Sequence, residues 1–140
     1  MIGPLVLLCV LAVSTAFGLW WQRRSGDLRA STRVAADDQW SPLGITLGER
    51  ATLVQFSSAF CQPCRATRQV LTDVAAVIPG VVYAEVDAEA HLDAVRALGV
   101  LKTPTTFVLD AQGHVVRRAS GQPRKADVIV AIGVAVDAGR

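Results

Sequence analysis

At 140 residues the chain is long enough for one domain of ordinary size and an appendage, and too short for two such domains. Its 14 basic and 12 acidic side chains give a net charge of +2 and are scattered after Gln22, so no basic stripe indicates a nucleic-acid partner. Three cysteines, two of them close together, argue against a disulfide-held scaffold, because a bond closing so short a loop constrains the unfolded chain little.

The first predicted element is a single transmembrane anchor, residues 1–22. No charged residue lies between Ile2 and Trp21, and about 20 helical residues at ~1.5 Å each reach across the roughly 30 Å of a bilayer core. The run ends in the order of an aromatic belt and a charged flank: Trp20, Trp21, Gln22, Arg23 and Arg24. We therefore expect residues 2–21 to contact membrane lipid. A cleaved secretory signal is the alternative, but such a signal has a basic segment before its apolar run, and none precedes this one.

The charges around the anchor predict its orientation. Only the terminal amine precedes the apolar run, whereas four arginines follow it: Arg23, Arg24, Arg29 and Arg33. Because positively charged flanks stay on the inner side, we expect a single-pass cell-membrane protein with its remaining chain in the cytoplasm. An extracytoplasmic domain is the alternative. Cys9 follows Val6-Leu7-Leu8, which lacks the small residue expected before a lipidated cysteine, so we expect Cys9 to face lipid.

A polar tether is predicted next, over residues 23–40. This segment is rich in Ala, Asp and Arg and has no apolar periodicity, which is typical of a linker. We expect the folded domain to cover residues 41–140 and to begin near Trp40. Gly44-Ile45-Thr46-Leu47 is a weak strand candidate at its start.

A stronger strand candidate, Ala51–Ser57, is rich in β-forming residues. A helix is predicted after it, because apolar side chains recur at helical spacing: Cys64, Leu71, Val74, Ala75 and Ile78. Pro79-Gly80 ends this helix. Cys64 therefore belongs to the buried stripe of the helix.

Between this strand and this helix lies the motif Cys61-Gln62-Pro63-Cys64. Pro63 suits the first helical turn, where no intrahelical N–H bond is lost. Cys61 is expected at the helix tip, where free backbone N–H groups and the positive end of the helix dipole favour a thiolate. We therefore predict that Cys61 is the nucleophile and that Cys64 is the shielded resolving thiol.

The remaining strands are predicted at Val81–Val86, Thr105–Leu109 and Val115–Ala119. The last two form a hairpin whose turn contains a glycine. A helix between the first two, Glu89–Leu98, is expected to be capped by Asp87 and to turn three residues inward: Leu92, Val95 and Leu98. The closing helix, Lys125–Val136, is expected to bury Val128, Ile129, Ile132 and Val136. The predicted α/β fold is a mixed sheet between helices, parallel where helices cross over and antiparallel at the hairpin.

The cysteine motif after a strand, together with Thr103-Pro104-Thr105 at the opening of a later strand, resembles the thioredoxin superfamily. The resemblance covers about Ala51 to Val136 and implies a thioredoxin-like three-layer sandwich behind the anchor. It implies that Pro104 follows a cis peptide bond beside the thiols and that backbone groups of Thr103 hold an incoming peptide as an extra strand. It also implies protein disulfides as substrates, an upstream dithiol donor such as a thioredoxin reductase, and no cofactor beyond the redox-active disulfide.

One departure from the family pattern concerns proton transfer. Gln55 stands where the family usually has a buried aspartate that helps to deprotonate the second cysteine, and a glutamine cannot take a proton at physiological pH. Glu85 is a candidate substitute, because it alternates with Tyr83 and Asp87 onto one face of its strand. The alternative is an exposed edge glutamate with no role in the reaction.

Other residues near the cysteines are expected to tune the thiols. Gln62 replaces the glycine of the commonest thioredoxin motif, and together with Pro63 it affects thiolate stability and the reduction potential. Arg65 and Arg68 stand in the first two helical turns. They either favour the Cys61 thiolate or form a solvated face.

The function predicted from the sequence is protein-disulfide reduction by thiol–disulfide exchange, which maintains the thiol redox state at the membrane. Two alternatives remain open. One is a redox-inactive tethered module that holds a partner at the membrane. The other is a zinc site built on the two cysteines, but Cys9 lies in the anchor and His91 and His114 are expected on the surface, so no metal site is predicted.

Overall fold

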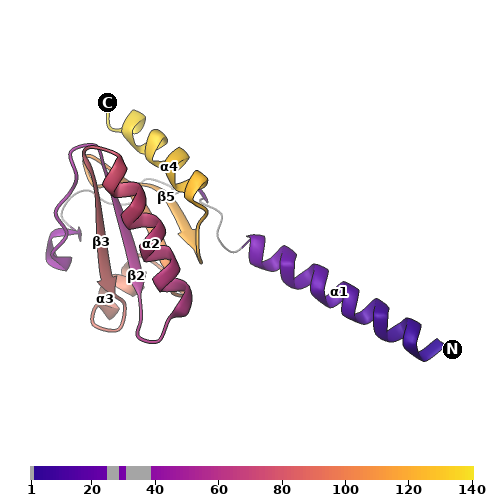
Figure 1. Ribbon diagram of the computed structural model, residues 1–140. Coiled ribbons are helices and arrows are strands. Elements are labelled where there is room, and N and C mark those ends of the chain that lie inside the picture. Colours follow the sequence, from indigo (N-terminus) through magenta and orange to yellow (C-terminus); the bar gives the residue numbers. More distant parts are fainter. Residues whose placement is uncertain (1, 25–28, 31–38) are drawn as a thin grey trace.

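The computed structural model describes residues 2–24, 29–30 and 39–140. In chain order they form α1 (Ile2–Arg24), β1 (Arg29–Ala30), the 3-10 helix η2 (Ser41–Leu43), β2 (Ala51–Ser57), α2 (Gln62–Val77), β3 (Val81–Asp87), α3 (Leu92–Ala97), β4 (Thr105–Asp110), β5 (Val115–Ser120) and α4 (Lys125–Ala138). Figure 1 shows α1 extending away from an α/β domain that the later elements form.

The five strands form one mixed sheet in the order β1-β5-β4-β2-β3. β2 and β3 run parallel, and the other neighbouring strands run antiparallel. All seven residues of β2 are buried, as expected for an inner strand of a sheet that is covered on both faces. This mixed sheet between helices confirms the predicted fold class.

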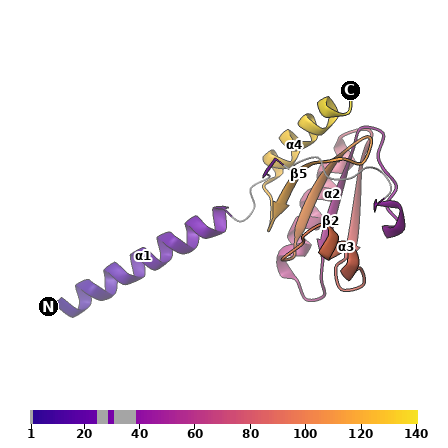
Figure 2. The same cartoon turned by 180° about the vertical axis from the view of Figure 1, so that it is seen from behind.

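Two apolar layers lie on opposite faces of the sheet. α2 and α4 cover one face (Figure 1), over a buried cluster made of Ala51, Leu53, Leu71, Val74, Val81, Val108, Val128, Ala131, Ile132 and Ala135. α3 and the segment around η2 cover the other face (Figure 2), over Trp40, Ile45, Val54, Phe56, Val86, Val100, Phe107, Leu109 and Val115. Burial of these side chains from water is the main force that holds the three layers together.

The segment from Gly44 to Leu47 forms no strand, so this prediction is wrong. The backbone N–H groups of Gly44 and Ile45 donate to the carbonyls of Ser41 and Trp40 in the η2 turn, instead of to a neighbouring strand. Ile45 nevertheless packs into the core. The apolar residues of this segment therefore predicted burial correctly, but they did not predict the backbone conformation.

β4 runs antiparallel to β2 and β3, whereas the helix between β3 and β4 had predicted a parallel crossover. The connection that contains the six-residue α3 begins and ends at the same end of the sheet, because Asp87 at the end of β3 stands opposite Ser57. β4 therefore starts with Thr105 opposite Phe56, near the end of β2, and runs back.

The helix predicted at residues 89–98 is shorter than expected. Asp87 does not cap it: its Oδ1 accepts the backbone N–H of Glu89 at 2.8 Å, which closes a turn before the helix begins. Leu92 consequently stands at the exposed start of α3 and is 53% exposed, although it was predicted to point inward. Val95 and Leu98 pack against the core as predicted.

The buried face of α4 also differs from the prediction. Ile129 is 44% exposed, and the buried residues are Val128, Ala131, Ile132 and Ala135. This spacing follows one helical stripe. Because α4 is apolar on nearly all sides, its sequence alone did not indicate which stripe faces the sheet.

Packed structure begins before residue 41. β1 lies within the segment predicted as a tether, and it pairs with β5 so that Arg29 stands opposite Arg118. Trp40 is completely buried, and its Nε1–H donates to the carbonyl of Gly113 at 2.8 Å. The start of the domain is thereby tied to the β4–β5 turn.

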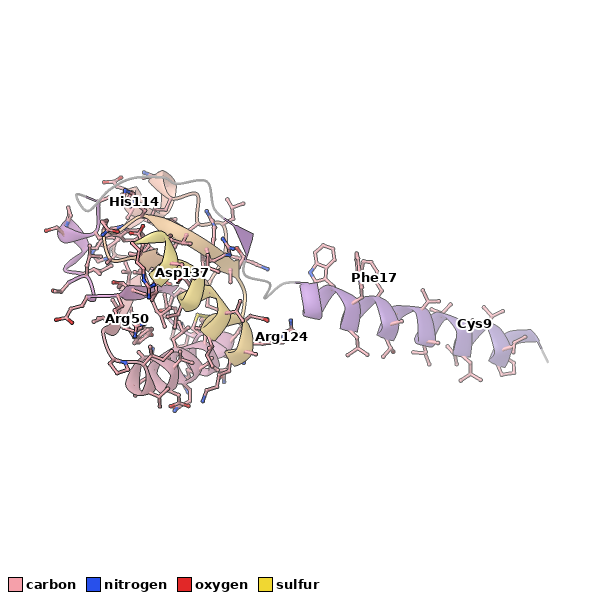
Figure 3. The ribbon with its side chains drawn as sticks, turned by 90° about the horizontal axis from the view of Figure 1, so that it is seen from above. Cys9, Phe17, Arg50, His114, Arg124 and Asp137 are labelled. Carbon is pink, nitrogen blue, oxygen red and sulfur yellow. A yellow bond between two sulfur atoms is a disulfide. The ribbon has the colours of Figure 1, made fainter. Side chains whose placement is uncertain are left out.

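α1 contains a stretch long and apolar enough to cross a membrane, Gly3–Trp21, of which no part is buried inside the structure. Figure 3 shows Cys9 and Phe17 on this helix, apart from the α/β domain. Cys9 is a free, exposed thiol. Length and composition alone fit both a membrane anchor and a signal sequence.

Candidate functional site

Cys61 and Cys64 are joined by a disulfide at the start of α2, with their Cα atoms 5.2 Å apart. Cys61 is the N-cap residue of α2 and has an extended backbone, and no side chain caps the helix there. Its side chain is half-buried, whereas Cys64 is 2% exposed. The pair thus has one sulfur within reach of solvent and one shielded behind it.

The first turn of α2 provides an electropositive setting for Cys61. Its N-terminal backbone N–H groups have no intrahelical acceptors, and no acidic side chain lies in this turn. Both features favour a thiolate at Cys61 when the disulfide is open. Gln62 and Pro63 begin the helix and are exposed, so either can influence this thiolate and neither is part of the core.

Phe60 directly precedes the disulfide and has an unusual conformation. Its φ of +60° lies in the left-handed region, which is costly for an aromatic residue. Its side chain is fully exposed, so packing of the ring does not explain this conformation. Strained backbone of this kind is often found at functional sites, and here it lies next to the half-buried sulfur.

Gln55 lies beneath the shielded cysteine. It is completely buried in β2, and its Nε2 donates to the backbone carbonyl of Cys64 at 2.9 Å. Its Oε1 accepts the phenol O–H of Tyr83 from the neighbouring strand β3 at 3.0 Å. The amide is therefore satisfied at both ends, and it supports the backbone of the first helical turn at the position where the resemblance implied a carboxylate.

A polar network extends from Gln55 to the edge of α2; we call it the Gln55–Glu85 network, and it consists of Gln55, Ser57, Arg68, Tyr83 and Glu85. Arg68 on α2 donates to Glu85 on β3 through Nε (2.8 Å) and Nη2 (2.7 Å). Ser57 Oγ also donates to Glu85, at 2.6 Å. These contacts connect α2, β2 and β3 below the disulfide.

The network shifts the pKa values of two of its acids in opposite directions. Hydrogen bonding from Arg68 lowers the pKa of Glu85, against an opposing effect of partial burial. Burial, followed by the nearby charge of Glu85, raises the pKa of Tyr83 to about 12. At neutral pH Glu85 is therefore a carboxylate and Tyr83 a neutral phenol that can donate to Gln55.

The placement of Glu85 and the two arginines refines the sequence hypotheses. Glu85 is exposed on β3, which is an edge strand of the sheet, as the alternative to the substitute hypothesis expected, and its carboxylate is bonded to Arg68 and Ser57. Arg68 is half-exposed and engaged with Glu85, so its charge is largely matched there instead of being directed at Cys61. Arg65 is exposed, as a solvated face would be.

The Thr103–Pro104 segment forms the wall opposite the first turn of α2. The peptide bond between these two residues is cis, as the resemblance implied. Ser58, just before the disulfide, shares a hydrogen bond of 2.8 Å between its Oγ and Oγ1 of Thr103. The carbonyl of Pro104 accepts the N–H of Gly121 at 2.7 Å, which fixes the segment to the loop after β5. Sequence reasoning missed Ser58 and Gly121, since no local pattern marks them.

The two histidines lie away from the cysteines in the chain, and each has its own local contact. His91 Nδ1 lies 3.0 Å from the carbonyl of Asp87, and His114 Nδ1 lies 3.1 Å from Oδ2 of Asp110. Within residues 2–24, 29–30 and 39–140, no group of three or more His, Cys, Asp or Glu side chains is arranged to hold a metal ion.

Comparison with known proteins relates this geometry to one family. The chain matches the thioredoxin family model over residues 34–133. It is 30% identical over 77 residues to thioredoxin H-type 1 of Nicotiana tabacum, a match that covers 55% of this chain and 60% of that protein. The matched region is therefore less than two thirds of the tobacco protein.

Solved structures show the same fold. Thioredoxin f from spinach chloroplast superimposes with a TM-score of 0.58 at 21% identity, over 76% of this chain and 93% of that one. A thioredoxin from Fasciola hepatica gives a TM-score of 0.53 at 27% identity, over 61% of this chain and 81% of that one.

Proposed function

Because this chain belongs to the thioredoxin family, we propose that it is a thiol–disulfide oxidoreductase that reduces disulfides of other proteins. The observation that carries the proposal is the Cys61–Cys64 disulfide at the tip of α2, with Cys61 partly exposed and Cys64 buried. A purely structural disulfide has no need of an accessible sulfur at a helix N-terminus. An exchange reaction needs one.

In the proposed reaction the Cys61 thiolate attacks one sulfur of a substrate disulfide. A bond forms between Cys61 and the substrate, the substrate S–S bond breaks, and the first substrate thiolate leaves. The Cys64 sulfur loses its proton and attacks the Cys61 sulfur, which releases the second substrate thiolate. The substrate gains two electrons and two protons, and an upstream dithiol donor, such as a thioredoxin reductase, then reduces the Cys61–Cys64 disulfide.

Substrate binding is assigned to the wall across from the disulfide. Thr103 offers backbone groups to an extended peptide, and Pro104 has no N–H that would compete for the same acceptors. The bond between Ser58 and Thr103 supports this assignment, because it ties the wall to the loop that carries Cys61.

Removal of the Cys64 proton needs a different arrangement from the usual one. Gln55 cannot accept a proton, and Glu85 is a weakened base because Arg68 and Ser57 bond to its carboxylate. We expect resolution of the mixed disulfide to be slower than with a carboxylate at position 55. The hydrogen bonds of Tyr83 and Gln55 lead from Glu85 to the backbone carbonyl of Cys64 and not to its sulfur, so they give Glu85 no direct route to this proton.

We further propose that α1 anchors the protein in the cell membrane, with the α/β domain in the cytoplasm. The span Gly3–Trp21 is exposed on all sides and long enough for this role, and lipid would cover it. The four arginines after the span favour the cytoplasmic side by the positive-inside rule. Substrates would then be proteins that reach the membrane surface.

The proposed activity is tested with the full chain in a neutral detergent, with insulin as the disulfide substrate and dithiothreitol as the reductant. The chain should accelerate insulin reduction above the rate with dithiothreitol alone. Cys61→Ser should abolish this acceleration, whereas Cys9→Ser, a control for the remaining thiol, should preserve it. Failure of the wild-type chain to accelerate the reaction would refute the proposal.

A further inference from the structure

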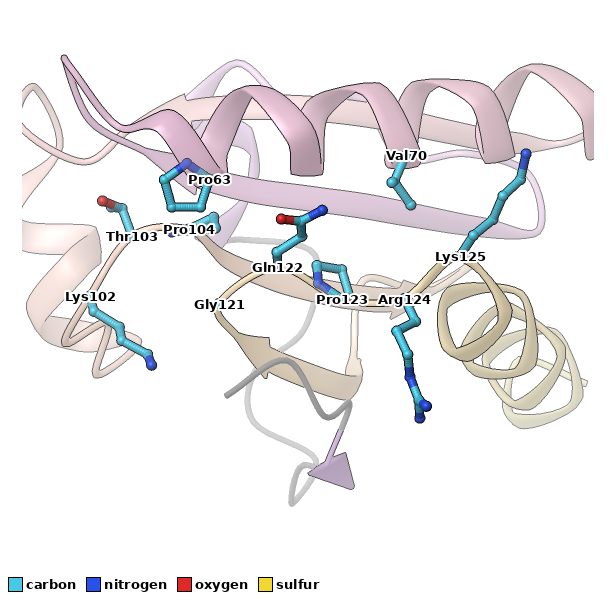
Figure 4. Close-up of a pocket in the computed structure, with 10 residues that line it drawn as sticks. All are labelled: Pro63, Val70, Lys102, Thr103, Pro104, Gly121, Gln122, Pro123, Arg124 and Lys125. Carbon is cyan, nitrogen blue, oxygen red and sulfur yellow. The ribbon is translucent and has the colours of Figure 1, made fainter. Parts of the chain in front are cut away.

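A groove with two lysines on its rim continues from the disulfide site; we call it the basic groove. Its volume is about 620 Å³, and it is lined by Pro63, Val70, Lys102, Thr103, Pro104, Gly121, Gln122, Pro123, Arg124 and Lys125. Figure 4 shows that these residues come from α2, from the Thr103–Pro104 wall and from the segment between β5 and α4. The groove therefore begins at the cysteine motif and leads toward the start of α4.

Part of the groove is lined by apolar side chains. Pro63 and Val70 contribute carbon surface, and the largely buried Pro104 and Pro123 also line the groove. The bond between the N–H of Gly121 and the carbonyl of Pro104 joins two of its walls. A groove that starts at the cysteine motif and has apolar walls suits an extended peptide segment next to a reacting cysteine.

The charged residues that line the groove are all basic. The chain contains two lysines in all, Lys102 and Lys125, and both line this groove. Figure 4 shows Lys102 beside Thr103 and Lys125 rising past Val70 toward α2, so the ammonium groups stand at different parts of the rim. No acidic side chain is among the lining residues.

Arg124 adds less to this charge than the lysines do. It forms an ion pair with Asp127 in the first turn of α4, with Nε 2.7 Å from Oδ2. Figure 4 also shows its side chain pointing away from the other lining residues. Arg124 is therefore directed away from the groove, and Lys102 and Lys125 are the other basic residues that line it.

We propose that the basic groove selects disulfide substrates whose reacting cysteine is flanked by acidic side chains. The inference rests on the proposed function, since it names the substrate class of the same site. Glutamate or aspartate side chains of the peptide pair with Lys102 and Lys125 while its backbone lies along Thr103. The exposed ion pairs raise the encounter rate and the affinity, and salt screens them.

The test compares three short peptides joined by the same disulfide to the same fluorophore. The flanking residues are Glu in the acidic peptide, Gln in the neutral one and Lys in the basic one. The full chain in a neutral detergent should reduce the acidic peptide with kcat/KM about three- to tenfold above that of the neutral peptide at low salt. The ratio should fall toward one at about 0.5 M salt.

Matched variants distinguish the effect of the groove lysines on this ratio from the effect of the protein's net charge. Lys102→Gln with Lys125→Gln should bring the acidic-to-neutral ratio close to one, whereas Lys102→Arg with Lys125→Arg should keep it. Arg96→Gln with Arg140→Gln removes the same charge from exposed positions outside the groove, and should also keep the ratio.

The outcomes distinguish this inference from the function on which it rests. A wild-type ratio near one at low salt would overturn the inference, as would a ratio that survives loss of both lysines or falls equally in the Arg96 and Arg140 control. In each of those cases reduction of the neutral peptide still supports the proposed activity. If no peptide is reduced, the proposed function fails and the inference falls with it.

Discussion

At the level of single residues, Gln55 distinguishes this site from the usual family pattern. The sequence identified it as a departure from the family pattern, and strand alternation placed Tyr83 and Glu85 on one face. The pairing of Glu85 with Arg68 could not be predicted, because it depends on how α2 is rotated above the sheet. Gln55 places a neutral amide where the family usually has a buried carboxylate. The ionised groups of the network, Glu85 and Arg68, pair with each other.

Tyr83 provides a direct probe of this network, because it is the only tyrosine in the chain. We expect its phenol to titrate near pH 12, in contrast to about 10 for an exposed tyrosine. Near-ultraviolet absorbance of the tyrosinate measures this midpoint in the folded chain and, as a control, in urea. Since folding favours the neutral phenol, its stabilisation is complete below about pH 10 and is lost as pH rises toward 12. A folded midpoint near 10 would contradict the partly buried setting of Tyr83 beside the Glu85 carboxylate.

Glu85→Gln tests the charged end of the network. The pKa of Glu85 is lowered in the folded state, so its stabilisation is present above the unfolded value of about 4.3 and is lost as pH falls below it. Since Arg68 is half-exposed, the variant should lose about 0.5–1 kcal/mol of unfolding free energy at pH 7, and less at pH 3. Urea unfolding measures both values.

The control for this variant is Asp93→Asn, which removes a fully exposed carboxylate 3.6 Å from Arg96 and should change stability little. An equal loss for Glu85→Gln at both pH values would show that the pair with Arg68 does not stabilise the fold. The same variant also tests catalysis: if the pH profile of disulfide reduction is unchanged, Glu85 does not substitute for the missing carboxylate.

At the level of elements, hydrophobic and β-forming patterns located every strand from β2 to β5 and both long helices of the domain. The errors have a common physical origin. Gly44–Leu47, the inner face of α4 and the direction of β4 after α3 are all decided by contacts between elements, which local periodicity does not contain. The cysteine motif was predictable because its helix-tip position follows from residues immediately beside it.

Trp40 tests how the start of the domain is tied to the β4–β5 turn. Trp40→Phe keeps an aromatic ring but removes the donor to the Gly113 carbonyl, which lies in a buried setting. We expect a loss of about 1–3 kcal/mol in the free energy of unfolding, measured with urea by circular dichroism. Trp20→Phe, in α1, is the matched control and should leave unfolding of the domain unchanged. An effect of Trp40→Phe no larger than the control would contradict this role.

At the scale of the whole molecule, the sequence separated an apolar N-terminal helix from a redox domain, and the structure has both parts. The basic groove was not predictable, since Val70, Lys102 and Lys125 come together only through the fold. In our proposal the redox site therefore selects its substrates in two ways. The charge of the basic groove favours acidic peptides, and the anchor limits the site to proteins near a membrane.

The anchor proposal makes a prediction about the mature chain. The full protein should remain with membranes after an alkaline carbonate wash, and mass spectrometry should find α1 still attached. A variant without residues 2–22 should be released into the soluble fraction. A mature chain that begins after Trp21 would instead identify α1 as a cleaved signal.

The most direct test of the central claim is the identity of the sulfur that bonds to the substrate. A Cys64→Ser variant in a Cys9→Ser background, mixed with a disulfide-containing protein, should accumulate a mixed disulfide because the resolving thiol is missing. Peptide mapping by mass spectrometry should place that bond on Cys61. If no mixed disulfide accumulates, or if Cys61→Ser accumulates an equal amount through Cys64, then Cys61 is not the nucleophile.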